Sequence, residues 1–190
     1  MKYKKFIPTS TFKSILDIPL EELKEKGVKL FLSDLDNTLI SYAESMPNEK
    51  SFEFKRRIDE LGFEFIVVSN SRKERVNKFC DAFGCPCVKF STKPLKRGIK
   101  KAINKVASKK YAPNEVILIG DQILTDVLGA NRCGINSGLV LPVDIKTDKR
   151  PTRFNRFFEQ LILNRIKKKE PKIYEEKLKE FDDLNDSKKM

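Results

Sequence analysis

Short runs of apolar residues alternate along the chain with longer segments in which apolar residues recur every three or four positions. The short runs have the length and composition of strands, and we predict strands at residues 28–33, 63–68, 87–90, 116–119 and 137–141. The segments between them have helical periodicity, and we predict helices at residues 51–61, 73–83, 95–109 and 124–132. This alternation indicates a mainly parallel sheet with helices on both faces.

The predicted fold is therefore a Rossmann-like, three-layer α/β/α domain. Its core is assigned to residues 25–145, after an N-terminal segment, 1–24, that packs on it. A basic amphipathic helix at 146–172 and a charged tail at 173–190 follow. The longest apolar run, 116–119, is far shorter than the roughly 20 residues that cross a bilayer. The basic N-terminus lacks the apolar stretch of a secretory signal, so we expect a cytoplasmic protein.

Composition excludes several kinds of chemistry. The chain has no histidine, which rules out Ser-His and Cys-His nucleophile pairs and every histidine-ligated metal centre. Its cysteines, Cys80, Cys85, Cys87 and Cys133, have neither paired C-x-x-C spacing nor a histidine partner, so we expect free thiols. Catalysis in this chain would depend on carboxylates, hydroxyls, lysines and a hard cation.

The net charge of +12 predicts anionic partners, such as phosphate compounds, an acidic lipid surface or nucleic acid. Residues 93–110 contain eight Lys or Arg and no acid, and residues 149–172 contain nine against two acids. Apolar residues recur at helical spacing in the second segment: Phe154, Phe157, Phe158, Leu161, Ile162 and Ile166. We expect this stripe to pack on the sheet as the terminal helix; the alternative is that it lies in an anionic membrane interface.

Polar residues cluster where the predicted strands end. Asp34 and Asp36 follow the first strand, Ser69 the second and Asp121 the fourth. Because ligands of an open parallel sheet bind outside the carboxyl ends of its strands, we expect these side chains to converge on one crevice. Two carboxylates so close in sequence repel each other unless a cation offsets their charge, and Mg²⁺ suits carboxylate and phosphate oxygens. We therefore predict a Mg²⁺ site, to which Asp121 and Asp126 add further acids.

Lys93 adds a positive charge, and Ser69 a hydroxyl, that suit phosphoryl oxygens. In this order, the residues resemble the motifs of the haloacid-dehalogenase superfamily of phosphohydrolases. The matching motifs are Asp34-Leu35-Asp36-Asn37-Thr38, Val68-Ser69-Asn70, Lys93-Pro94, and Gly120-Asp121 with Asp126. The resemblance implies the haloacid-dehalogenase-like hydrolase fold and phosphatase activity.

The resemblance also implies a role for each matched residue. Asp34 attacks phosphorus and forms an aspartyl-phosphate, and Asp36 protonates the leaving oxygen and then activates water. The Mg²⁺ ligands are the carboxylates of Asp34 and Asp121 and the backbone carbonyl of Asp36, with Asp126 as a direct or indirect partner. The phosphoryl group is held by Ser69, Lys93 and the backbones of Asn37 and Asn70, and Thr38 orients Asp36.

No large cap domain fits between the motifs, because one helix uses most of the residues between the first two. The open crevice that this predicts favours a bulky, lipid or macromolecular substrate. More narrowly, the chain resembles the YqeG-type phosphatases of class IIIA, on the basis of Phe6-Ile7-Pro8, residues 120–132 and residues 151–159. That group is similar to phosphatidylglycerophosphate phosphatases, which implies an anionic phospholipid substrate and peripheral contact with the inner face of a membrane.

Other functions are compatible with the sequence. A nucleic-acid end phosphatase would use the basic surface along a phosphate backbone, but the chain has no aromatic-glycine RNA-binding signature and no Trp. Sugar-phosphate phosphatases with a Cys/His zinc loop are disfavoured by the absence of histidine. A non-catalytic nucleic-acid-binding or ribosome-binding protein is disfavoured by the intact Asp34, Asp36, Lys93 and Asp121. The sequence makes no prediction of the oligomeric state.

Overall fold

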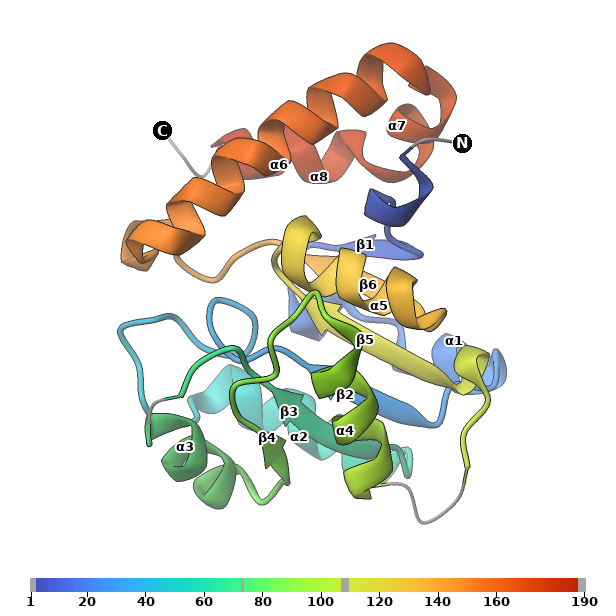
Figure 1. The fold of residues 1–190 in the computed structure, drawn as a ribbon. Coiled ribbons are helices and arrows are strands. Elements are labelled where there is room, and N and C mark those ends of the chain that lie inside the picture. Colours follow the sequence, from blue (N-terminus) through green and yellow to red (C-terminus); the bar gives the residue numbers. More distant parts are fainter. Residues whose placement is uncertain (1–2, 73, 107–109, 188–190) are drawn as a thin grey trace.

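The computed structural model describes residues 3–72, 74–106 and 110–187. A six-stranded parallel sheet with strand order β1-β6-β5-β2-β3-β4 forms its centre (Figure 1). The strands are β1 (Ser10–Phe12), β2 (Leu30–Ser33), β3 (Glu64–Val68), β4 (Cys87–Val88), β5 (Val116–Gly120) and β6 (Asn136–Val140). The predicted parallel α/β fold is thus confirmed, and β2 to β6 lie at the predicted positions.

The first strand, β1, was not predicted, because three residues give no periodicity to detect. It extends the sheet beyond β6, with Ser10 opposite Gly138. A side chain at Gly138 would collide with Ile119, so glycine allows β6 to lie flat against its neighbours here. Part of the N-terminal segment therefore belongs to the sheet.

Helices cover both faces of the sheet. The helices α1 (Leu20–Glu25), α2 (Glu49–Glu60) and α3 (Arg75–Phe83) share one apolar cluster, while α4 (Lys96–Val106) and α5 (Leu128–Cys133) share another. Side chains alternate across the strands, so that Phe31 of β2 faces the first cluster and Leu30 and Leu32 face the second. The expected helix ends at residue 73 and at residues 107–109 lie outside the described part of the chain. Between β2 and β3 the chain forms α2 and its connecting loops, so no large cap domain is inserted there.

The C-terminal part folds as α6 (Arg150–Lys169), α7 (Pro171–Lys177) and α8 (Lys179–Ser187), which lie together beyond the β1 edge of the sheet (Figure 1). The expected charged tail is therefore helical as far as Ser187, and residues 188–190 lie outside the described part. Tyr174 of α7, Phe181 of α8 and Leu178 between these two helices are buried in one cluster with Leu163 and Ile166 of α6. Among the described residues, no helix is long and apolar enough to span a membrane.

The expected inward packing of the apolar stripe of α6 is wrong for its first four residues. The exposed fractions of these side chains are 64% for Phe154, 61% for Phe157, 40% for Phe158 and 40% for Leu161. Of the predicted stripe, Ile166 is buried and Ile162 packs against the same cluster, while Thr152, Glu159 and Leu163 are the other buried residues of the helix. Leu163 and Ile166 pack with α7 and α8. Glu159, on the same inner side of the helix, accepts a hydrogen bond from the Leu124 N–H. The first four residues of the stripe are therefore turned outward.

Candidate active site

The carboxyl ends of three neighbouring strands meet at one crevice. Asp34 follows β2, Ser69 follows β3 and Asp121 follows β5, and β2 pairs with both of the other strands. The chain runs outward from β2 in one direction through β3 and β4 and in the other through β5 and β6. A crevice forms at such a change of direction, because the two connections leave on opposite faces of the sheet. The backbone N–H of Asp34 donates to the Ile119 carbonyl at 2.8 Å, which holds Asp34 beside β5.

Three carboxylates and one amine occupy this crevice. Oxygens of Asp34, Asp121 and Asp126 lie within 4.8 Å of one another, and all three residues are buried. Lys93 Nζ is 2.8 Å from Asp34 Oδ1 and 2.7 Å from Asp126 Oδ1. Residues from three different connections thus surround one point, as the strand-end pattern predicts.

Asp126 is fixed by the turn that carries it. The turn η4 (Ile123–Val127) is π-helical, and Asp126 Oδ2 accepts from the Gln122 N–H at 3.2 Å and from the Thr125 hydroxyl at 3.1 Å. Its other oxygen is left to face Lys93. A side chain at position 120 would collide with the Asp126 carboxylate, which explains the glycine before Asp121.

Asn70 positions the loop of Lys93 rather than a ligand. Its amide oxygen accepts from the Lys93 N–H at 2.8 Å and from the Ser91 hydroxyl at 2.8 Å, and its Nδ2 donates to the Lys93 carbonyl at 3.0 Å. These bonds hold the backbone from which Lys93 reaches the carboxylates. The sequence predicted a phosphate contact for the Asn70 backbone and gave no sign of this side-chain function.

Asn37, predicted to contact phosphate through its backbone, makes its contacts within and beyond the turn that follows β2. It has the left-handed backbone angle φ of 63°, and its N–H donates to the Ile40 carbonyl at 2.7 Å, so the amide is already used inside the turn. Its side chain donates to Asp148 at 2.5 Å. The Thr38 hydroxyl, expected to orient Asp36, lies 3.4 Å from Asp121 Oδ1 instead. Ser69 Oγ accepts from the Ser71 N–H at 3.0 Å, which leaves its own proton available for donation.

Asp36 is buried and forms an ion pair with Arg75 of α3. Asp36 and Asp34 both line a cavity of about 230 Å³. Its lining residues come from both halves of the sheet and from α6: Asp34, Asp36, Tyr42, Asn70, Ser71, Lys93, Gln122, Thr125, Lys149, Pro151, Thr152 and Asn155. Arg75 was not predicted, because arginine in the first turn of a helix is common without any functional contact.

The buried acids have strongly shifted pKa values. Burial raises the pKa of Asp34 from 3.8 to about 7, although the charge of Lys93 opposes the shift. Burial likewise raises the pKa of Asp121 to about 6, and Arg156 opposes that shift. Burial thus disfavours the ionised form of both carboxyl groups in the metal-free crevice. Three convergent carboxylates provide the hard oxygen ligands that Mg²⁺ requires, so these residues fit that ion.

We expect the affinity for Mg²⁺ to rise with pH between about 5 and 8, because protons compete with the cation for Asp34 and Asp121. The sign follows from the raised pKa values. In the metal-free protein these acids favour folding when protonated, and this stability is lost as pH rises from 3.8 through about 7. Calorimetric titration with Mg²⁺ across this range should show up to about tenfold weaker binding per pH unit between the pKa values of Asp34 and Asp121, and up to about a hundredfold below the pKa of Asp121, where two protons must leave. A pH-independent affinity would contradict the expectation.

Arg156 of α6 supports the site from outside the sheet. Its Nη2 is 2.6 Å from Asp121 Oδ2, and its Nε forms an ion pair with Asp148. Asp148 also accepts from Asn37, so the first turn after β2, the loop after β6 and α6 are joined through one carboxylate. The sequence contained a signal for this contact, because Arg156 lies on the side of the helix opposite the aromatic stripe.

Replacing Arg156 by glutamine is expected to lower catalytic efficiency roughly 10- to 100-fold, as is typical when a group that orients a metal ligand is removed. The reason is that Asp121 would lose its fixed orientation and its counter-charge. Arg153→Gln is a matched control, because Arg153 is an exposed arginine on the same helix. Equal activity of the two variants, measured as phosphate release from soluble p-nitrophenyl phosphate at saturating Mg²⁺, would argue against a positioning function for Arg156.

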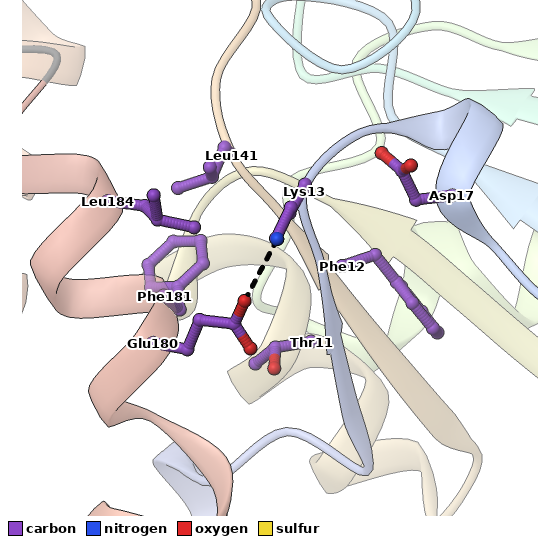
Figure 2. Close-up of a pocket in the computed structure, with 8 residues that line it drawn as sticks. All are labelled: Thr11, Phe12, Lys13, Asp17, Leu141, Glu180, Phe181 and Leu184. Atoms are coloured by element: carbon purple, nitrogen blue, oxygen red, sulfur yellow. Dashed lines mark ion pairs between the residues drawn. The ribbon is translucent and has the colours of Figure 1, made fainter.

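A second hollow lies between β1 and α8 (Figure 2) and has a volume of about 280 Å³. Lys13 and Glu180 face each other across it at 3.1 Å, with Phe12, Phe181 and Leu184 beside them. Both charged side chains are largely exposed, and the hollow includes none of the residues that the motifs predict. It is a gap between packed elements and has no cluster of chemically active groups.

The sheet and the crevice at its strand ends have the arrangement that the motifs of the haloacid-dehalogenase superfamily predict. Residues 1–141 match the family described as mitochondrial PGP phosphatase. The probable phosphatase YqeG of Bacillus subtilis (strain 168) is 37% identical over 169 residues, which cover 89% of this chain and 96% of that protein. The chain therefore belongs to this family of phosphatases. The crystal structure of an uncharacterized protein from Listeria monocytogenes serotype 4b has a similar fold, with a TM-score of 0.50 and 18% identity over 65% of this chain and 84% of that one.

Proposed function

We propose that the protein hydrolyses a phosphate monoester by nucleophilic attack of Asp34, with Mg²⁺ bound by Asp34, Asp121, Asp126 and the Asp36 carbonyl. The observation on which the proposal depends is the position of the Asp34 carboxylate. It lines the cavity, lies within 4.8 Å of two further acids and is 2.8 Å from Lys93 Nζ. In this position, Asp34 could reach a phosphoryl group that enters the cavity. The charged groups beside Asp34 could stabilise that phosphoryl group.

The reaction would proceed in two displacements. In the first, an Asp34 oxygen forms a bond to phosphorus while the bond from phosphorus to the leaving oxygen breaks, and Asp36 gives that oxygen a proton. In the second, a water oxygen attacks phosphorus, Asp36 takes up the water proton, and the bond from phosphorus to Asp34 breaks. The products are an alcohol and inorganic phosphate, and both aspartates return to their starting states.

The surrounding residues would supply orientation and charge. Lys93 would stabilise the phosphoryl oxygens as negative charge develops on them, and Ser69 would donate a hydrogen bond to one of them. Arg75 would hold Asp36 in the position from which it protonates the leaving oxygen. When bound, Mg²⁺ would supply further positive charge to the phosphoryl oxygens.

For the substrate, we propose phosphatidylglycerophosphate. The family description supports a phosphate on a lipid. Lys149 lines the cavity, and its positive charge suits an anionic headgroup. Access to such a substrate would require peripheral contact with an anionic membrane.

A panel of phosphorylated compounds, each with and without Mg²⁺, tests the proposal. Phosphatidylglycerophosphate in detergent, a 5′-phosphorylated oligonucleotide, a sugar phosphate and p-nitrophenyl phosphate should be compared by phosphate release. We expect Mg²⁺-dependent turnover that is fastest with the lipid. Release from the oligonucleotide or the sugar with the lipid untouched would contradict the substrate but not the mechanism. Full turnover of all four without a divalent cation would contradict the metal dependence.

A further inference from the structure

The outer face of α6 is apolar, aromatic and exposed. At about 100° per residue, Phe154, Phe157, Phe158 and Leu161 fall on a stripe about 100° wide. The ring centroids of Phe154 and Phe158 are 4.7 Å apart, and those of Phe157 and Phe158 are 5.5 Å apart, so the three phenylalanines form one continuous patch. Phe154 and Phe157, with 64% and 61% of their surface exposed, are more exposed than any other large apolar side chain of the described residues. We call these four residues the aromatic face.

The exposed charges of α6 have one sign. Within α6, which the structure describes throughout, the exposed charged residues are Arg150, Arg153, Arg165, Lys167, Lys168 and Lys169, of which Lys167 lies over the Tyr174 ring of α7. The only acid of the helix, Glu159, is buried on the inner side, where it accepts a hydrogen bond from the Leu124 N–H at 2.9 Å. A partner of this surface must therefore combine apolar contact with negative charge.

An anionic lipid bilayer has both properties, arranged in layers. Aromatic and aliphatic side chains enter the boundary of the acyl chains, while arginine and lysine beside them reach the headgroup phosphates. A second copy of the chain fits poorly, because two faces with this excess of positive charge would repel each other. Nucleic acid would match the cations, but Leu161 has no π-face for stacking, and the phenylalanine rings already pack edge to face on one another.

The same helix also lines the proposed active site. Pro151, Thr152 and Asn155 of its first turns line the cavity, and Asn155 donates to Gln122 at 3.0 Å. Arg156 lies between Phe154 and Phe157 in the sequence, but its side chain is on the inner side of the helix, where it contacts Asp121. A helix lying on a bilayer by its outer face would therefore hold the cavity entrance close to the headgroups.

We propose that the aromatic face of α6, with its flanking arginines and lysines, is the surface by which this protein binds anionic membranes. The idea that this surface presents a lipid phosphate to Asp34 rests on the proposed function, whereas the idea that it binds membranes does not. Vesicle binding and phosphate release can therefore be measured separately, and a negative result in one assay does not affect the interpretation of the other.

Co-sedimentation with phosphatidylcholine vesicles, with and without phosphatidylglycerol, tests the proposal. We expect the unchanged protein to bind the anionic vesicles and to bind neutral vesicles much more weakly. The double variant Phe154→Gln/Phe157→Gln should bind anionic vesicles on the order of tenfold or more weakly, because two aromatic rings that would enter the membrane are lost. Phe52→Gln is the matched control and should bind normally, since Phe52 is a 47% exposed phenylalanine on α2, away from α6.

Turnover of soluble p-nitrophenyl phosphate and the circular dichroism spectrum should be the same in all three proteins, which shows that the variants are folded. An unchanged protein that ignores anionic vesicles would overturn the proposal. Binding that survives the double variant would overturn it too, because the membrane would then contact another surface. The aromatic face could also be shown to have another partner. If the unchanged protein did not bind vesicles but formed a dimer or bound duplex RNA, and the double variant lost that interaction, the proposal would be overturned.

Discussion

Replacing Asp34 by asparagine is expected to reduce phosphate release by at least about 10⁴-fold, as the loss of a covalent nucleophile does in other hydrolases. The amide cannot form the aspartyl-phosphate, and it is a weaker ligand for a divalent cation. The fold should be retained, because the change removes a charge whose burial is already unfavourable, as the raised pKa of about 7 indicates. Thermal unfolding without Mg²⁺ should show equal or higher stability than in the unchanged protein.

Asp59→Asn provides the matched control, since Asp59 is an exposed acid on α2 that pairs with Lys55 far from the crevice. Its activity should be unchanged. Substantial residual activity of the Asp34 variant, with the same substrate and Mg²⁺ concentration, would remove Asp34 from the position of nucleophile.

Replacing Lys93 by methionine is expected to destabilise the metal-free protein by about 3–5 kcal/mol at pH 8, the usual cost of breaking a buried ion pair. Lys93 Nζ lies between Asp34 and Asp126, at 2.8 and 2.7 Å, so its removal leaves both carboxylates without their shared counter-charge. Mg²⁺ should restore part of the lost stability, because it binds only the folded arrangement of the acids. The measurement is urea unfolding with and without Mg²⁺.

A control variant and a second pH test whether the effect of Lys93→Met is due to its charge. Lys101→Met changes an exposed lysine of α4 and should leave the free energy of unfolding almost unchanged. In Lys93→Met the loss should become smaller at acidic pH, since protonation of the neighbouring acids removes the repulsion. An equal loss at both pH values would mean that packing, rather than charge, is the function of this lysine.

The sheet could be predicted from the sequence because its strands are buried on both faces. Strands of this kind read as continuous apolar runs, and the polar residues at the end of each run mark the edge where ligands bind. Asp34 and Asp121 were chosen by that pattern, and Lys93 and Asp126 by their charge and by the resemblance of their motifs. The structure places all four side chains around one point. Charged residues at strand ends meet in space because parallel strands share an edge, whatever their distance in the sequence.

The partners of these residues could not be predicted in the same way. Asn37 was assigned to a phosphate, but its backbone is committed to Ile40 and its side chain to Asp148. Asn70 supports the Lys93 loop, and Arg75 pairs with Asp36. Each of these contacts depends on which hydrogen-bond donors lie nearby in the folded protein. The periodicity of apolar residues in the sequence does not predict this.

The sequence by itself determined that this chain forms a parallel α/β sheet whose strand ends present carboxylates and a lysine. The tertiary structure alone decided how α6 is turned. A helix with an aromatic side and a side containing Arg156 and Glu159 suggests, by burial of apolar surface alone, that the aromatic side faces inward. It faces outward here because Arg156 and Glu159 find partners in Asp121 and the Leu124 N–H, and because Leu163 and Ile166 bury enough apolar surface with α7 and α8. The orientation of an amphipathic helix depends on the hydrogen-bond partners, ion-pair partners and apolar contacts that neighbouring elements provide. The sequence of the helix does not specify these neighbours.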